Sequence, residues 1–98
     1  MKESKSNFKS SVCDCGNVNV GGAVNGEFVL NCDKEIRKCD GGCTCGGKPR
    51  ITFTLGEGGF SFNTVAKVIN GKREVTRVVT VSFSDRSSQI VYIKYRII

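Results

Sequence analysis

The stretch EVTRVVTVSFSDRSSQIVYIKYRII, residues 74–98, decides the fold class. Apolar and polar residues alternate on both sides of the polar segment DRSS, residues 85–88. A period of two is typical of strands that bury one face, and a short polar segment between two such runs is typical of a turn. The sequence therefore predicts two long strands, at residues 74–84 and 89–98.

The side chains of these two strands fall on two faces. One face of each strand is mainly apolar and carries Val75, Arg77, Val79, Val81 and Phe83 in the first strand and Val91, Ile93, Tyr95 and Ile97 in the second. Val78 is out of phase with its neighbours, which indicates either a β-bulge or a second, partly covered face. Two covered faces favour a small sandwich or barrel.

Two further strands are predicted upstream, at residues 50–55 and 60–69, with the glycine-rich turn GEGG between them at residues 56–59. The pair Asn-Gly at residues 70–71 is a strong hairpin signal, because both residue types tolerate a positive φ angle. The sequence thus predicts an antiparallel meander over residues 50–98.

The half of the chain before Pro49 is rich in cysteine and glycine and poor in apolar residues. It has short strand patterns at residues 17–20 and 27–32, and its one candidate helical turn is at residues 33–38. The predicted fold is all-β: a small antiparallel sandwich or partly open barrel of about six strands with a loop-like N-terminal half.

The chain has 98 residues, which suits one domain. We expect a single all-β domain over residues 12–98, in which residues 12–48 are a crosslinked part. Residues 1–11 are polar and basic and are expected to form a flexible arm. They show no signal peptide, which favours a cytoplasmic protein; a secreted protein whose leader is removed is the alternative. No apolar run reaches the ~20 residues of a membrane-spanning helix.

All six cysteines precede Pro49, and four of them form two Cys-x-Cys-Gly elements, CDCG at residues 13–16 and CTCG at residues 43–46. Two such elements facing each other would present four thiolates, the ligand set of a structural zinc site. The sequence contains no histidine, so the thiolates would carry the site. The predicted zinc ligands are Cys13, Cys15, Cys43 and Cys45, with Cys32 and Cys39 as extra ligands or a disulfide pair.

A disulfide framework is the rival interpretation, because the cysteines are even in number and the chain is short. It would suit a secreted, viral or thermophile protein with a structural or self-assembly role. Neighbouring cysteines such as Cys13 and Cys15 would then bond outward, since a bridge between residues i and i+2 is cramped. Free thiols are the third interpretation.

The sequence predicts a non-enzymatic protein. It has no histidine for general acid–base chemistry and no recognisable nucleophile motif. The net charge of +6 falls mainly on residues 50–98 and suits an anionic partner such as nucleic acid. Basic and aromatic residues that lie close together in this half are the candidate contacts: Lys72, Arg73, Arg77, Tyr92, Lys94 and Arg96.

The last strand, residues 89–98, is long and apolar, and an exposed edge of that kind favours self-association. The sequence as a whole therefore predicts a small β-domain, organised by structural zinc, that acts as a binding or assembly module. An anionic partner and a second copy of the chain are the two candidate partners.

Overall fold

The computed structural model describes residues 7–42, 48–68 and 71–98. These residues form seven strands and no helix. In chain order the strands are β1 (Val12–Val18), β2 (Ala23–Val29), β3 (Ile36–Asp40), β4 (Thr52–Gly56), β5 (Gly59–Val65), β6 (Glu74–Phe83) and β7 (Ser88–Ile97).

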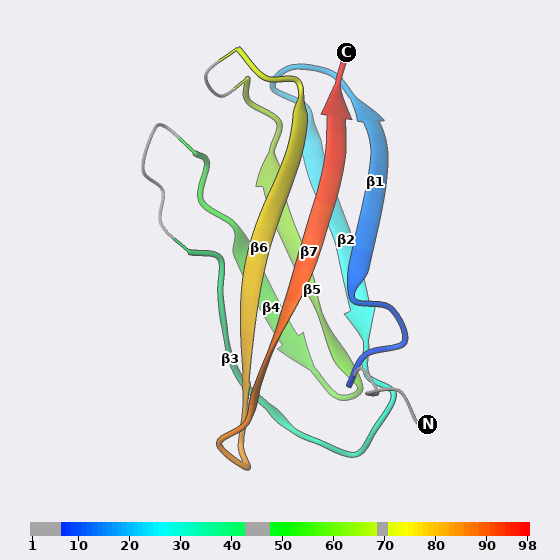
Figure 1. Ribbon diagram of the computed structural model, residues 1–98, viewed down its shortest axis with the longest axis vertical. Coiled ribbons are helices and arrows are strands. Elements are labelled where there is room, and N and C mark those ends of the chain that lie inside the picture. Colours follow the sequence, from blue (N-terminus) through cyan, green and yellow to red (C-terminus); the bar gives the residue numbers. More distant parts are fainter. Residues whose placement is uncertain (1–6, 43–47, 69–70) are drawn as a thin grey trace, which may run out of the picture.

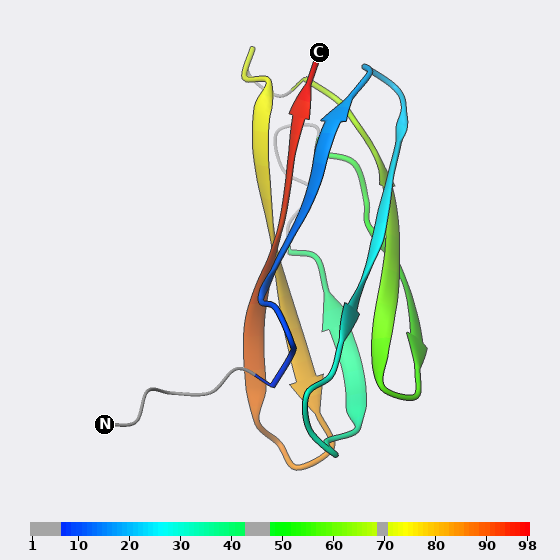
Figure 2. The ribbon, with the colours of Figure 1, turned by 90° about the vertical axis from the view of Figure 1, so that its right-hand side faces the viewer.

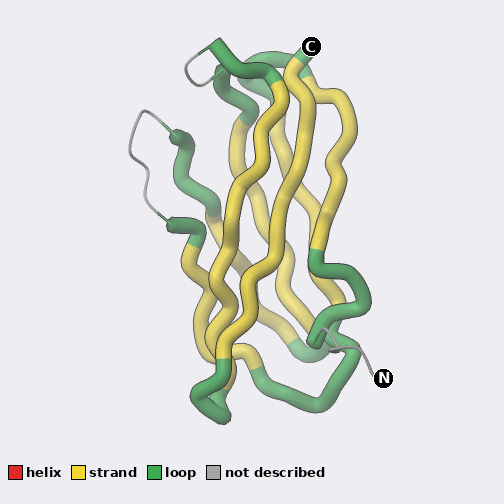
Figure 3. Tube along the Cα trace, in the orientation of Figure 1, coloured by secondary structure: helices red, strands yellow, loops and turns green. Residues whose placement is uncertain are grey.

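The strands pack as two layers, which Figures 1 and 2 show from two sides. One sheet has the order β1-β7-β6-β3 and the other has the order β2-β5-β4. All neighbouring strands are antiparallel except β1 and β7, which are parallel. Figure 3 shows that most of the connecting loops gather at the two ends of this sandwich. The prediction of a small all-β sandwich is confirmed.

The core lies between the sheets and follows the alternation of the sequence. The inward side chains of β6 and β7 include Val79, Val81, Phe83, Val91 and Ile93, all fully buried. Burying a side chain of this size contributes about 1.5–3 kcal/mol relative to leaving it in water. The face predicted for these two strands is therefore the face that holds the sheets together.

The N-terminal half supplies more of the core than its composition indicated. Phe8 is only 1% exposed, and its ring lies 6.0 Å from Phe28, 5.7 Å from Phe60 and 6.0 Å from Phe83, between ring centroids. Its backbone is anchored too, because the Lys9 amide donates to the Val29 carbonyl at 2.8 Å. Phe8 belongs to the segment predicted to be a flexible arm; the structure instead places it in the core.

Residues 33–38 do not form the helical turn that the sequence suggested. Residues 36–40 form β3, which pairs with β6 and has an irregularity between Ile36 and Lys38. The free edge of β6 offers these residues a partner for their backbone groups, whereas a helix this short has few internal hydrogen bonds.

The predicted meander over residues 50–98 is wrong in one connection. The β4–β5 and β6–β7 hairpins form as expected, but β5 and β6 lie in different sheets. Both edges of β5 are occupied, by β2 and β4, so β6 has no edge of β5 to join. Residues 69–70 lie outside the described part of the chain, and the strands on either side of them do not form a hairpin.

The last strand is not an edge. β7 pairs with β6 on one side and with β1 on the other, as Figure 1 shows. The sequence analysis predicted an edge strand because β1, which pairs with β7, belongs to the half of the chain that was expected to be loop-like. The basis for self-association through this strand is therefore removed.

We expect Phe8→Ala to lower the free energy of unfolding by about 3–5 kcal/mol, because a buried aromatic ring with several ring neighbours leaves a cavity. Urea unfolding followed by tyrosine fluorescence measures this change. Lys9→Ala, at the exposed neighbouring position, is the control and should change the value by less than about 0.5 kcal/mol. Equal effects of the two variants would mean that Phe8 is not part of the core in solution.

Candidate functional site

Cys13 and Cys15 come together on β1, where the period of two directs both side chains toward β2. Both are half-buried, and the Cys15 thiol lies 3.8 Å from the Asn25 carbonyl oxygen. Gly26 on β2 leaves the space that Cys13 uses, since a Cβ at that position would lie 3.0 Å from the Cys13 sulfur. This part of the predicted metal site is a compact pair of thiols.

The other predicted ligands are not brought to this pair within the described residues. Cys43 and Cys45 lie outside them. Cys39 is on β3, at the opposite edge of the sheet from β1, three strand spacings or roughly 14 Å away. In the described part of the chain no three His, Cys, Asp or Glu side chains are grouped to hold a metal ion. The zinc site remains a prediction.

The four described cysteines, Cys13, Cys15, Cys32 and Cys39, are free thiols. Cys32 and Cys39 are not bonded to each other in the structure; a disulfide was one of the two roles that the sequence left open for this pair. Cys32 is exposed in the loop before β3, with its sulfur 3.7 Å from the Asn7 carbonyl oxygen, whereas Cys39 is half-buried in β3. Cys39 lies opposite Val81 of β6 and packs against the core between the sheets.

Burial changes the acidity of two of these thiols. It raises the pKa of Cys39 to about 12. It is also the main reason why the pKa of Cys15 rises to about 12, with further contributions from the neighbouring Cys13 and the charge of Asp14. Both groups therefore stay protonated near neutral pH.

Five of the six predicted anion contacts are exposed, three on the outer face of β7 and two directly before β6. Tyr92, Lys94 and Arg96 alternate along β7 and are all exposed. Lys72 and Arg73 immediately precede β6, and the Arg73 carbonyl accepts a hydrogen bond from the Ile97 amide at 2.7 Å. We call these five residues the basic outer face.

Neighbouring strands add acidic and apolar residues to the basic outer face. Glu74 lies opposite Arg96, with the ion pair at 3.9 Å, and Asp14 lies opposite Lys94. Tyr92 of β7 pairs with Val12 of β1 on one side and with Val78 of β6 on the other, so these three residues form a row across the sheet. Val12 is 41% exposed, Tyr92 38% and Val78 45%. This apolar row was not predicted, because it depends on the β1–β7 register, which no local sequence pattern reveals.

Arg77 is the exception among the predicted contacts, because its side chain points inward and is only 3% exposed. Its phase along β6 is that of Val75 and Val79, so the alternation that buries the valines also buries the arginine. Its Nη1 atom is buried and has no hydrogen-bond partner in the described part of the chain. Arg77 is therefore not part of the basic outer face.

A pocket of about 900 Å³ lies at the end of the sandwich where β4 and β5 join. Its lining includes Asp33, Glu35, Glu57 and Asp85, together with apolar residues. Lys34 forms an ion pair with Asp85 at 3.4 Å and lies 5.3 Å from the centre of the Phe83 ring. Hydrogen bonds from Ser87 lower the pKa of Asp85. The charged residues that line this pocket are thus mainly acidic.

No protein family and no curated protein matches the chain. The chain is similar to a solved structure, a Bacteroides ovatus GH5 xyloglucanase in complex with a XXXG heptasaccharide, with a TM-score of 0.48 and 19% sequence identity. The similarity covers 92% of this chain and 18% of that one, so the chain spans about a fifth of the length of the xyloglucanase. Among the described residues, no helix has the length and apolar character needed to cross a bilayer.

We expect Cys15 and Cys39 to react with iodoacetamide about a hundred-fold or more slowly than Cys32 near neutral pH. The thiolate is the reactive form, and burial disfavours it at both positions. Mass spectrometry of peptides from a labelling time course gives the rates, and labelling in denaturant is the control, in which all three should react alike. Equal rates in the folded protein would contradict the buried environment.

We expect Arg77→Met to raise the free energy of unfolding by about 1–3 kcal/mol in buffer that contains only chloride as anion. The change removes a buried donor without a partner and keeps a long apolar side chain in its place. Chemical unfolding measures this, and Arg73→Met, at an exposed position, should leave the value nearly unchanged. A large loss of stability would show that the guanidinium makes favourable interactions.

Proposed function

We propose that the chain is a non-enzymatic binding module that holds single-stranded nucleic acid against the basic outer face. The observation that carries the proposal is the exposed run Tyr92, Lys94, Arg96 on β7, with Lys72 and Arg73 at its end. An exposed aromatic ring can stack on a base of any sequence, and neighbouring cations attract the phosphates.

The flat outer face of a sheet suits this role. The row of Val12, Tyr92 and Val78 supplies apolar surface for bases beside the cations. Glu74 and Asp14 offset part of the positive charge, so the interaction would be modest and strongly dependent on salt.

The absence of histidine from the sequence supports a role without acid–base catalysis. A zinc ion on Cys13, Cys15, Cys43 and Cys45 would be a structural addition to this module. The binding proposal does not depend on such an ion, because none of the five basic-outer-face residues is a cysteine.

We expect the double variant Lys94→Gln/Arg96→Gln to weaken binding of a labelled oligothymidine by about tenfold at low salt. It should also lower the slope of log K against log salt by about 1.4, since two phosphate contacts on a single strand are lost. Fluorescence anisotropy across a salt series measures both quantities. Tyr92→Ala should weaken binding by about 1–3 kcal/mol and leave the slope unchanged, because stacking releases no counterions.

The matched control is Lys9→Gln/Arg37→Gln, which removes the same charge from exposed positions away from the basic outer face. It should keep most of the affinity of the unaltered protein. The proposal fails if the unaltered chain does not bind the oligonucleotide at low salt, or if the control variant loses as much affinity as the β7 variant.

A further inference from the structure

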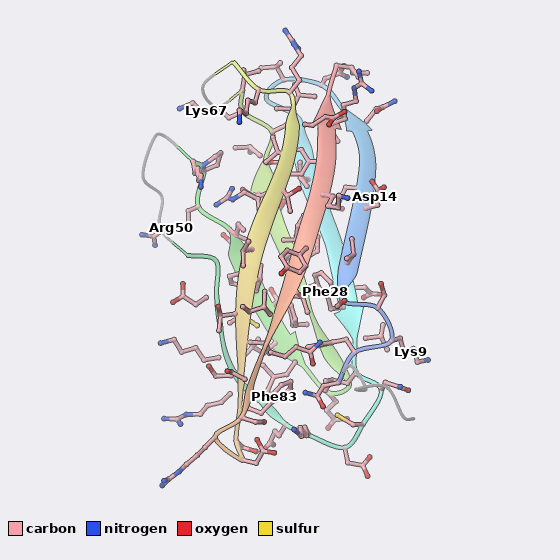
Figure 4. The ribbon with its side chains drawn as sticks, in the orientation of Figure 1. Lys9, Asp14, Phe28, Arg50, Lys67 and Phe83 are labelled. Atoms are coloured by element: carbon pink, nitrogen blue, oxygen red, sulfur yellow. The ribbon has the colours of Figure 1, made fainter. Side chains whose placement is uncertain are left out.

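A buried arginine lines a second pocket, at the side of the sandwich where β3 and β4 lie. The pocket has a volume of about 510 Å³, and its lining includes Arg77, Arg50, Cys39, Gly41, Ile51 and Phe53. Arg77 reaches it from β6, Cys39 from β3 and Phe53 from β4. Figure 4 labels Arg50 on this side of the molecule, away from β1 and β7.

The positive charge of this pocket is not balanced by ion pairs in the described part of the chain. The two ion pairs found there, Lys34–Asp85 and Arg96–Glu74, involve neither Arg50 nor Arg77. Asp40 also lines the pocket, and its Oδ1 atom accepts a hydrogen bond from the Gly42 amide at 2.9 Å. The lining thus contains two arginines and one aspartate.

Of the two arginines, Arg77 is the more informative because it is buried. A buried donor without an acceptor is costly, and a buried charge without a partner is more so. Arg77 lines the pocket, and its Nη1 atom is buried without an acceptor. A ligand oxygen in the pocket would meet this donor when the guanidinium turns toward the pocket, and the new hydrogen bond would remove this cost. Guanidinium is suited to such a ligand, because its planar fork matches the two oxygens of a carboxylate or phosphate.

The remaining walls favour an anion attached to an apolar body. Ile51 is buried and Phe53 is half-buried, and both belong to the segment that leads into and through β4. Cys39 adds an uncharged wall, since burial raises the pKa of its thiol to about 12 and it therefore does not compete as an anion.

We propose that this pocket binds a small organic oxyanion, with Arg77 as the buried donor, Arg50 as the cation at the rim, and Ile51 and Phe53 against the apolar part of the ligand. The site is distinct from the basic outer face, because Arg77 points to the inner side of the sheet whose outer side carries Lys94 and Arg96. It would take a carboxylate or a phosphate ester of a size that about 510 Å³ can hold.

The test is a titration of the full chain with benzoate, inorganic phosphate and benzamide at millimolar concentrations, followed by amide and arginine NMR signals and by melting temperature. Benzamide has the shape of benzoate without the charge. We expect benzoate to shift the Arg77 side-chain signals and the Gly41 and Gly42 amide signals and to raise the melting temperature, and benzamide to do neither. Phosphate should act on the same signals with lower affinity, because it lacks the apolar body.

Variants separate the roles of the two arginines. Arg77→Lys keeps a cation but loses the planar fork, and should weaken benzoate binding at least about tenfold. Arg50→Gln changes an exposed side chain, and should weaken benzoate binding by a smaller factor of about three. Arg77→Met should abolish the benzoate-dependent rise in melting temperature.

Lys94→Gln/Arg96→Gln should bind benzoate as the unaltered chain does, which keeps this result independent of nucleic-acid binding. The proposal is overturned if benzoate and benzamide give the same response, if neither oxyanion gives one, or if Arg50→Gln and Arg77→Lys both bind benzoate with unaltered affinity.

Discussion

The pairing of β7 on both sides is the constraint on which the rest of the structure depends. β6 pairs with it antiparallel and β1 pairs with it parallel, so that β7 is an inner strand of its sheet. A strand in this position has one face for the core and one for solvent, and its side chains alternate between them. The same alternation places Val91, Ile93, Tyr95 and Ile97 inside and Tyr92, Lys94 and Arg96 outside. The core and the basic outer face are two consequences of one register.

This constraint also explains which parts of the fold the sequence could predict. Strand alternation and turn residues are local signals, and they located β5, β6, β7 and the two tight hairpins well. The parallel β1–β7 pair joins residues about eighty positions apart, and nothing in the local sequence of Val12–Val18 identifies its partner. Because the sequence did not reveal β1 as its partner, the last strand was predicted to be an edge, and the glycine-rich half was predicted to contribute few core residues. Phe8 was missed for a similar reason, because a lone aromatic residue among polar ones has no period.

The candidate sites also divide into parts that local sequence patterns predict and parts that depend on contacts between distant segments. Three of the six predicted residues share the outer face of β7 because they alternate along one strand, and Lys72 and Arg73 are near them because β6 pairs with β7. Arg77 was assigned to the core face by its phase and to an anion site by its charge, and the structure supports the first assignment. The pocket around it could not be predicted, because it combines residues of β3, β4 and β6, which belong to two different sheets.

The N-terminal half is ordered by apolar packing and strand pairing as well as by any bonds to its cysteines. If sulfur bonds were needed there, the segment would contribute little to the core, yet Phe8, Val24, Phe28 and Leu30 are all buried. β1 and β2 also satisfy backbone groups by pairing with β7 and β5. In this setting Cys13 and Cys15 act as small, half-buried packing residues, and the space for them comes from the missing side chain of Gly26. A metal ion or a disulfide in this half would therefore add to a sandwich whose described strands already pair and bury a shared apolar core.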